Sequence, residues 1–439
     1  YDFLADQPTL PNTFNPPHDF TTGTGFAQIK LRHNLAADNE VTLHYYHNRD
    51  RGTESVSAQF IPGFPQLINA DRLATRDDFE IQHVFVPFRS LRVAWGGEIR
   101  RDTLQNALVL GTPAKQSADL ARVFVNGELR VAPEWIVNAG LTYEDYSLSG
   151  DNISPRLYLN YLPSRSHAFR IGHSRGYRTP TIFEDRSNWQ NRTGPLLVDQ
   201  FYLSSGGLRA ERVDSSELGY VGNLGWLGGS VDVRLFQLKF HDWLCRIERP
   251  LPATTVELTP EQVAYDFANC KTTSKKRGVE IGARLRPFRG TLISAAWSYH
   301  DEMSKFTAEN VGYAAPDGTS LSGVPGTPSS IPTNRIHAPR HLGSLLIGQA
   351  LPWGMNASVA WYFVTADRNV PSQLVGFHVA TPPLQRSNRV DVRLAKSILI
   401  GATRTEFAVV GQNIGGPTGE MFQSQTFTRR WMATAAFDL

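Results

Sequence analysis

The stretch from Gly278 to His300 constrains the fold of this chain more than any other. Apolar and polar residues alternate one by one in both of its arms, with the apolar positions at Val279, Ile281, Ala283 and Leu285 and then at Ile293, Ala295, Trp297 and Tyr299. Successive side chains of a β-strand point to opposite faces, so this alternation separates an apolar face from a polar one. The short connection at residues 287–290 predicts an antiparallel hairpin.

The same unit recurs along the whole chain and predicts about 17 strands. Their expected ranges are 24–34, 40–50, 76–86, 91–101, 118–131, 135–146, 155–162, 168–176, 215–223, 230–244, 278–285, 291–300, 341–350, 356–364, 389–397, 404–412 and 429–439. The connections alternate between turns of a few residues and loops of about 6 to 40 residues. This alternation predicts an all-β, antiparallel up-and-down barrel with turns on one rim and long loops on the other. Residues 259–270 are the only helix-like segment, and they fall within a loop.

One expected strand, residues 230–244, breaks its own alternation. Val231, Val233 and Leu235 share one face, whereas the apolar residues Phe236, Leu238 and Phe240 take the other. A β-bulge near Leu235 would restore the pattern. The alternative is that the second set of side chains faces a packed interior.

Charged residues occupy many positions on the face opposite the apolar one: Arg92, Glu98, Arg100, Glu128, Arg130, Arg156, Arg170, Arg234, Glu280, Arg284 and Arg393. In a dry sandwich core each of these charges would cost several kcal/mol. Lipid outside and water inside a barrel satisfy both faces at once. No apolar run reaches the roughly 20 residues of a membrane-spanning helix. The pattern therefore favours a transmembrane β-barrel, and an array of soluble β-sandwiches is the alternative.

Other classes of function have little support in the sequence. The net charge is only +3 and no basic run is interleaved with aromatic residues, which argues against nucleic-acid binding. The 12 histidines show no recurring metal-ligand spacing. No Gly-rich phosphate loop opens a helix. We therefore expect no enzyme, no metal site and no cofactor.

The two cysteines, Cys245 and Cys270, enclose a loop of about 25 residues. A disulfide between them would fit an oxidising compartment. Two unrelated free thiols are the alternative.

Five short motifs, in order along the chain, resemble strand motifs of the TonB-dependent outer-membrane receptors. They lie at residues 154–157 (SPRL), 173–180 (HSRGYRTP), 208–219 (LRAE and SELG), 277–280 (RGVE) and 411–414 (GQNI). The matching positions are Pro155, Arg156, Gly176, Pro180, Glu211, Glu217, Gly219, Gly278, Glu280, Asn413 and Phe437. The chain departs from the family pattern in having Ala210 in place of a proline, and in ending with Phe-Asp-Leu instead of an aromatic residue.

The resemblance implies about 17 strands of a barrel of about 22, with short periplasmic turns and long extracellular loops. Residues 1–439 would then form a barrel domain that is N-terminally truncated and lacks the plug domain that precedes the barrel. The implied location is the bacterial cell outer membrane. The implied partners are outer-membrane lipid and lipopolysaccharide, a small-molecule ligand and, through the plug, the TonB–ExbB–ExbD complex.

The implied function is TonB-energised uptake of a scarce nutrient, foremost a ferric siderophore or a similar chelate. Cobalamin or an oligosaccharide, or a passive porin-like channel, are the alternatives. The expected ligand-binding residues lie in and just before the loop at 177–212: Arg175, Arg178, Arg186, Trp189, Arg192 and Tyr202. Guanidinium groups bind carboxylate, catecholate or phosphate oxygens through paired hydrogen bonds, which predicts an anionic ferric chelate. Alternatively, these arginines pair with Glu184, Asp185 and Asp199 or with lipopolysaccharide.

Overall fold

The computed structural model describes residues 18–61, 63–256, 264–269, 272–306, 339–366, 386–401, 403–419 and 426–438. Nearly all of this part of the chain is β-structure, and its helices are single turns. No helix in the described ranges is long and apolar enough to cross a membrane.

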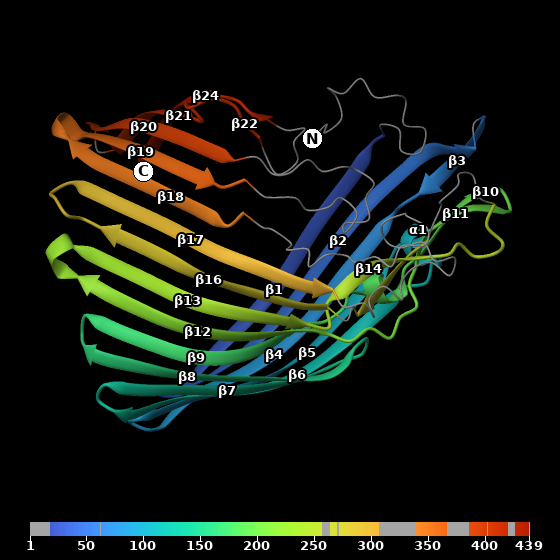
Figure 1. Ribbon diagram of the computed structural model, residues 1–439, viewed down its shortest axis with the longest axis horizontal. Coiled ribbons are helices and arrows are strands. Elements are labelled where there is room, and N and C mark those ends of the chain that lie inside the picture. Colours follow the sequence, from blue (N-terminus) through green and yellow to red (C-terminus); the bar gives the residue numbers. More distant parts are fainter. Residues whose placement is uncertain are drawn as a thin grey trace.

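Eighteen strands form one large curved sheet among the described residues (Figure 1). One of them, β3 (Phe64–Asn69), pairs only with the outer part of β2. The other strands follow one another in chain order, each antiparallel to the next. They are β1 (Phe20–Ala36), β2 (Asn39–Ile61), β4 (Arg72–Phe88), β5 (Leu91–Gln105), β6 (Gln116–Ala132), β7 (Trp135–Tyr146), β8 (Gly150–Ser164), β9 (His167–Arg178), β12 (Glu211–Leu224), β13 (Gly229–His241), β16 (Thr272–Leu285), β17 (Thr291–Phe306), β18 (His341–Leu351), β19 (Met355–Val364), β20 (Ser387–Ile400), β21 (Thr403–Gln412) and β24 (Arg430–Asp438). Each expected strand is present, and most extend further than predicted, but the strand expected at residues 230–244 ends at His241.

The register aligns apolar side chains into continuous rows across the sheet. One such row runs through Leu159, Ile171, Leu218, Leu235, Val279 and Tyr299 on six successive strands. Its central members remain exposed although they are large and apolar, with exposed fractions of 58% for Ile171 and 48% for Leu218. We call this face the outward face. A wide exposed apolar band on a regular sheet is the pattern of a surface that contacts lipid.

The opposite, inward face carries the charged side chains, as predicted, and several of them form ion pairs across strands. Glu217 is only 8% exposed and accepts hydrogen bonds from two arginines, with Oε1 2.7 Å from Arg170 Nη2 and Oε2 3.0 Å from Arg234 Nε. Arg234 also reaches Glu280, whose Oε2 lies 3.2 Å from its Nη1. Paired carboxylates and guanidinium groups avoid the cost of isolated buried charges.

The break in alternation on β13 is explained by inward-facing apolar side chains. Residues 229–241 keep a continuous register with both neighbouring strands, so no β-bulge lies at Leu235. Phe236 is 9% exposed and packs over Gly278, where an added Cβ would lie 2.8 Å from the ring. The Tyr299 carbonyl oxygen would be closer still, at 2.3 Å, so the glycine is needed because this carbonyl and the ring together occupy the space of a side chain.

Two sequence-based expectations about connections are wrong. The β7–β8 connection on the long-loop rim has only three residues, because β8 begins at Gly150 and not near Pro155. Gly150 has φ 73°, a left-handed conformation that glycine adopts without strain and that permits the tight turn. The segment expected to be helix-like is a strand where it is described, β15 (Ala264–Asn269).

Both ends of the large sheet are open edges among the described strand pairs. β1 pairs only with β2, and β24 pairs only with β21. All 17 residues of β1 are exposed.

The outward face makes a prediction about stability. Ala295 lies mid-strand in β17 on this face, between Ala283 and Leu345. Ala295→Arg should lower the free energy of unfolding by about 2–4 kcal/mol, because it places a charge in hydrocarbon. The matched inward variant is Ser298→Arg, opposite Glu280, and it should cost far less. Urea unfolding of the membrane-inserted protein measures both, and equal costs on the two faces would contradict the lipid-facing assignment.

Candidate functional site

Two long connections on the same rim fold together into a second, four-stranded sheet, which we call the rim sheet. Its strands are β10 (Asn188–Thr193), β11 (Leu196–Leu203), β15 and β14 (Leu244–Arg249), in that order. β11 and β15 run parallel and meet at Tyr202 and Tyr265. β10 and β11 lie at the right-hand end of Figure 1, near β3, and β14 lies further toward the middle of the view. Residues 179–210 and the described residues 242–256 and 264–269 therefore form one structural unit.

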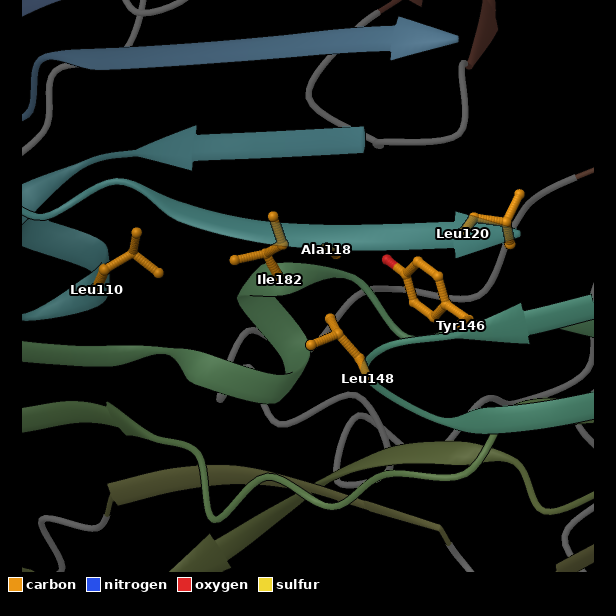
Figure 2. Close-up of a cluster of buried hydrophobic side chains, with 6 residues drawn as sticks. All are labelled: Leu110, Ala118, Leu120, Tyr146, Leu148 and Ile182. Carbon is orange, nitrogen blue, oxygen red and sulfur yellow. The ribbon is translucent and has the colours of Figure 1, made fainter. Parts of the chain in front are cut away.

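Two small apolar clusters hold this rim in place. The first joins α1 (Ala107–Leu110), α2 (Ile182–Arg186) and the ends of β6 and β7, as Figure 2 shows. Its members are Leu110, Ala118, Leu120, Tyr146, Leu148 and Ile182. The second brings Val198 of the rim sheet against Ala58 and Phe60 of β2. A capping box between Thr181 and Glu184 fixes the start of α2.

A fully buried carboxylate connects the two loops. Asp266 on β15 accepts hydrogen bonds from Ser205, with Oδ1 3.0 Å from the backbone N and Oδ2 2.7 Å from Oγ. Arg249 Nε lies 2.5 Å from the same Oδ2. Because a buried charge without partners is costly, these contacts lock the position of β15 relative to the segment after β11.

The rim sheet carries a group of aromatic rings with a guanidinium above it. The rings of Phe183, Trp189, Phe201, Tyr202, Tyr265 and Phe267 form a continuous set of neighbours, with centroids 5.0 to 6.4 Å apart. Arg246 lies 4.3 Å from the Tyr265 centroid and donates a hydrogen bond of 3.2 Å to the Tyr202 hydroxyl. Flat apolar surface beside a cation suits an anionic ligand with aromatic rings.

Two of the predicted ligand-binding arginines contact groups of their own chain. Arg178 Nη2 lies 3.0 Å from Glu184 Oε1, and its Nε lies 2.5 Å from Glu211 Oε2. Arg186 Nη1 donates to Gln116 Oε1 at 3.0 Å and to the Ser117 carbonyl at 3.2 Å. Arg186 Nε also lies 3.6 Å from Asp185 Oδ2. These contacts attach α2 to the large sheet, and both arginines thus form the carboxylate pairs within the loop that were the alternative to ligand binding.

The other predicted ligand-binding residues differ in accessibility. Arg175 lies on the outward face of β9 and pairs with Asp214 at 2.7 Å, so it does not point toward the lumen. Tyr202 is only 8% exposed. Arg192 is exposed and donates to Gln190 Oε1 at 3.0 Å, and among the described residues it has no carboxylate partner. Trp189 is half-buried, with its ring 5.0 Å from that of Phe201.

The family-motif positions have structural roles. Two of them, Glu217 and Glu280, form ion pairs on the inward face, and Gly219 lies opposite Arg234 on that face. Arg156 packs over Gly140, also on the inward face. Glu211 accepts from the Leu244 backbone N at 2.7 Å in addition to Arg178.

Four further motif positions lie at strand ends or on the outward face. Pro180 is fully buried beside α2, and Gly176 lies opposite Val213. Pro155 and Phe437 are on the outward face, opposite Leu141 and Thr405.

Asn413 ends β21 with φ 53° and is 1% exposed. Its Nδ2 donates to the Phe427 carbonyl at 2.6 Å, and its backbone N donates to Asp391 Oδ1 at 2.9 Å. Asn413 thus holds Phe427 through its side chain and β20 through its backbone N, and asparagine is one of the few residues that adopt this left-handed conformation readily.

Sequence reasoning missed Arg246, Tyr265, Asp266 and Phe267. Tyr265 and Phe267 alternate with Asp266, a period of two that would have indicated a strand. Within the described residues, no three His, Cys, Asp or Glu side chains are arranged to hold a metal ion.

This architecture defines the class of the protein: a β-barrel sheet of the outer-membrane type that carries long, structured loops on one rim. The model of the family "TonB dependent receptor-like, beta-barrel" matches residues 2–396. None of the curated proteins matches the chain in sequence. The chain belongs to the TonB-dependent receptor β-barrel family, and the resemblance of its motifs is confirmed. It is an outer-membrane protein, with short periplasmic turns and long extracellular loops.

Solved structures share the fold. The ferric enterobactin receptor of Pseudomonas aeruginosa superposes with a TM-score of 0.71 at 12% identity, over 95% of this chain and 61% of that one. The ferric-catecholate import receptor Fiu of E. coli gives 0.65 at 11%, over 95% and 64%. The alcaligin receptor FauA of Bordetella pertussis gives 0.56 at 14%, over 95% and 61%. The chain thus spans less than two thirds of each of these receptors.

Cys245, at the start of β14, is disulfide-bonded, and Cys270 lies outside the described residues. The pairing of the two remains a prediction. Closing a loop of about 25 residues should stabilise the ordered rim by roughly 3 kcal/mol. Non-reducing peptide mapping of protein from the outer membrane should recover one peptide pair holding both cysteines, and Cys245→Ser should speed proteolysis of residues 242–269. Alkylation of both thiols without reduction would contradict the prediction.

Proposed function

We propose that this chain is the barrel part of a receptor that imports an iron-loaded siderophore across the outer membrane. The rim sheet is the observation that carries the proposal. On the extracellular rim it carries an exposed Arg192 and the half-buried rings of Trp189 and Phe201. Behind them, Arg246 lies over the ring of Tyr265, which is 8% exposed. Membership of the family and the likeness to siderophore receptors support it.

The chemistry of the rim favours an anionic, partly aromatic chelate over a neutral sugar. Guanidinium groups form charge-assisted hydrogen bonds with catecholate or carboxylate oxygens, and rings stack on flat ligand surfaces. A similar receptor has been solved with enterobactin bound. Of the six residues predicted to bind ligand, Arg178 and Arg192 are exposed and Trp189 is half-buried. Arg178 is engaged by Glu184 and Glu211, which leaves Arg192 and Trp189 as the residues proposed to contact the ligand. In this proposal Arg178 and Arg186 hold the rim in shape.

Energy for uptake is proposed to come from the TonB–ExbB–ExbD complex acting through a plug domain. Ligands that bind tightly at the rim leave slowly, so a passive channel would gain nothing from a high-affinity site. An energised step removes the conflict between tight binding and fast release, because it separates the capture of the ligand from its release.

The test is uptake of a ferric catecholate, labelled with radioactive iron, by cells that carry the full-length protein as their only receptor for it. Arg192→Ala and Trp189→Ala should each weaken ligand affinity about tenfold, the loss of one charge-assisted hydrogen bond or one stacking contact. Arg165→Ala, an exposed arginine in the β8–β9 turn on the opposite rim, is the matched control and should leave affinity unchanged.

The same cells decide between the alternatives. Uptake that persists when TonB is deleted would indicate a passive channel. Unchanged affinity in both rim variants, or competition by cobalamin or an oligosaccharide, would contradict the siderophore assignment. Arg178→Ala should lower the amount of assembled receptor instead, because it removes the ion pairs of both Glu184 and Glu211.

A further inference from the structure

Three neighbouring turns on the periplasmic rim each carry an exposed aromatic side chain. Trp226 lies in the turn between β12 and β13, Phe288 in the turn between β16 and β17, and Trp353 in the turn between β18 and β19. Their exposed fractions are 81%, 73% and 83%, so most of each ring is free of contacts with the chain. The turns lie at the left-hand end of Figure 1, at the opposite end of the strands from the rim sheet. We call these three residues the aromatic row.

The three turns hold one another in place. The backbone N of Arg286 donates to the Leu227 carbonyl at 2.9 Å, and that of Ala350 donates to the Gly290 carbonyl at 2.8 Å. Gly290 has φ 78°, and an added Cβ there would lie 2.9 Å from the Ala350 Cβ, so glycine permits the close approach of two turns. Neighbouring hairpins are two strands apart, which spaces the turns about 10 Å from one another. The aromatic row is therefore a preformed linear array.

Trp353 occupies a backbone conformation that a bulky residue rarely adopts. Its φ is 63° and its ψ is 26°, in the left-handed region that favours glycine and asparagine. Its side chain makes no hydrogen bond among the described residues and buries little surface, so no contact within the fold offsets this strain. Strain at an exposed residue indicates that the side chain serves a contact outside the chain.

The aromatic row is distinct from the aromatic residues that face lipid. Those lie on strands: Trp135, Tyr161, Phe169 and Tyr220 are neighbours across β7, β8, β9 and β12 on the outward face, with ring centroids 4.5 to 6.5 Å apart. Aromatic residues in this position mark the periplasmic boundary of the hydrocarbon. β12 continues for four residues after Tyr220, about 13 Å, before the turn that carries Trp226 begins. Trp226 thus lies beyond that boundary, on the periplasmic side.

The turns of the aromatic row carry positive charge only. Arg286 and Arg289 are exposed on either side of Phe288, and neither forms an ion pair among the described residues. The three turns, residues 225–228, 286–290 and 352–354, contain no Asp or Glu. The surface therefore attracts an anionic partner.

Another periplasmic turn with the same sequence shows the contrast. The β4–β5 turn repeats Pro-Phe-Arg at residues 87–89, and Phe88 is 57% exposed. Its backbone is hydrogen-bonded to the strands beside it, next to the turns at 37–38 and 133–134. Those turns carry Asp38 and Glu134 and no aromatic residue. Phe88 is thus an isolated ring between carboxylates.

We propose that the aromatic row binds peptidoglycan, the polymer of linked sugar rings and carboxylate-bearing peptides that lies beneath the outer membrane. The negative face of an aromatic ring packs against the C–H groups of a sugar ring, and the exposed guanidinium groups pair with carboxylates. The spacing of the turns is close to the length of one disaccharide of such a chain, so successive rings meet successive disaccharides. A fluid lipid headgroup layer offers no repeat of this kind. The contact anchors the receptor to the cell wall.

The test is co-sedimentation of the full-length receptor, in mild detergent, with purified, protein-free peptidoglycan sacculi. Loss of one ring contact lowers affinity about fivefold, so Trp226→Ala with Trp353→Ala should lower it about 25-fold. Arg286→Gln with Arg289→Gln should weaken binding at low salt and change it little at high salt, where screening already removes the attraction. Phe88→Ala is the matched control, since it removes an exposed ring from an isolated turn, and it should leave binding unchanged.

Trp353→Asn separates a role in binding from a role in folding. Asparagine adopts the left-handed conformation more readily, so this variant should melt at a higher temperature than the parent while it binds sacculi about fivefold more weakly. A tryptophan with a structural role would lower the melting temperature when replaced. Heat-modified migration on gels confirms that each variant is folded.

Three results would overturn the proposal. The double alanine variant could sediment as much as the parent, or Phe88→Ala could lose as much binding as that variant does. Alternatively, phosphatidylglycerol added to the micelles could displace the sacculi completely, which would make the aromatic row a lipid anchor. Siderophore uptake is a separate readout, so failure here leaves the proposed function untouched.

Discussion

Backbone hydrogen bonding is the constraint on which the rest of this structure depends. An unpaired N–H or C=O group in hydrocarbon costs several kcal/mol, so a chain that crosses the membrane as strands must pair each strand with its neighbours. The ladder from β1 to β24 does so without interruption among the described strands. Once the strands are paired, the alternation of side chains between the two faces decides which residues meet lipid and which face the interior. Apolar residues such as Leu218 meet lipid, and the charges between them must find partners on the inside, as Glu217 does with Arg170 and Arg234.

Above the apolar band this constraint is relaxed, because water can satisfy the backbone. The long connections there are free to leave the ladder, and they obtain order from other sources. A small sheet, two apolar clusters and the buried Asp266 hold the rim together. Because no lipid dictates the pattern, polar and aromatic side chains can gather in this region. The ligand chemistry of such a protein is therefore concentrated where the repeating part of the fold ends.

This division also explains what the sequence could predict. Strict alternation revealed the strands, their order and their two faces, because lipid on one side leaves little freedom. The rim sheet escaped notice because its strands have only six to eight residues, and because β11 pairs with β15 across a long stretch of chain. The arginines show the same limit. Nothing in the sequence distinguishes Arg178, held by Glu184 and Glu211, from Arg192, which has no described carboxylate partner.

The distribution of unpaired charge carries the argument one step further. Inside the sheet, arginines share carboxylates, so Arg170 and Arg234 are neutralised together by Glu217 and Glu280 and contribute to the stability of the wall. Outside, at the border of the apolar band, Lys239 and Lys275 face each other although each cross-strand repulsion costs roughly 0.2–1 kcal/mol. A cost of this size is small beside the stability of the ladder, so the fold tolerates it. It disappears when an anion lies between the two lysines. Excess charge on this protein is thus best understood through the solvent it faces.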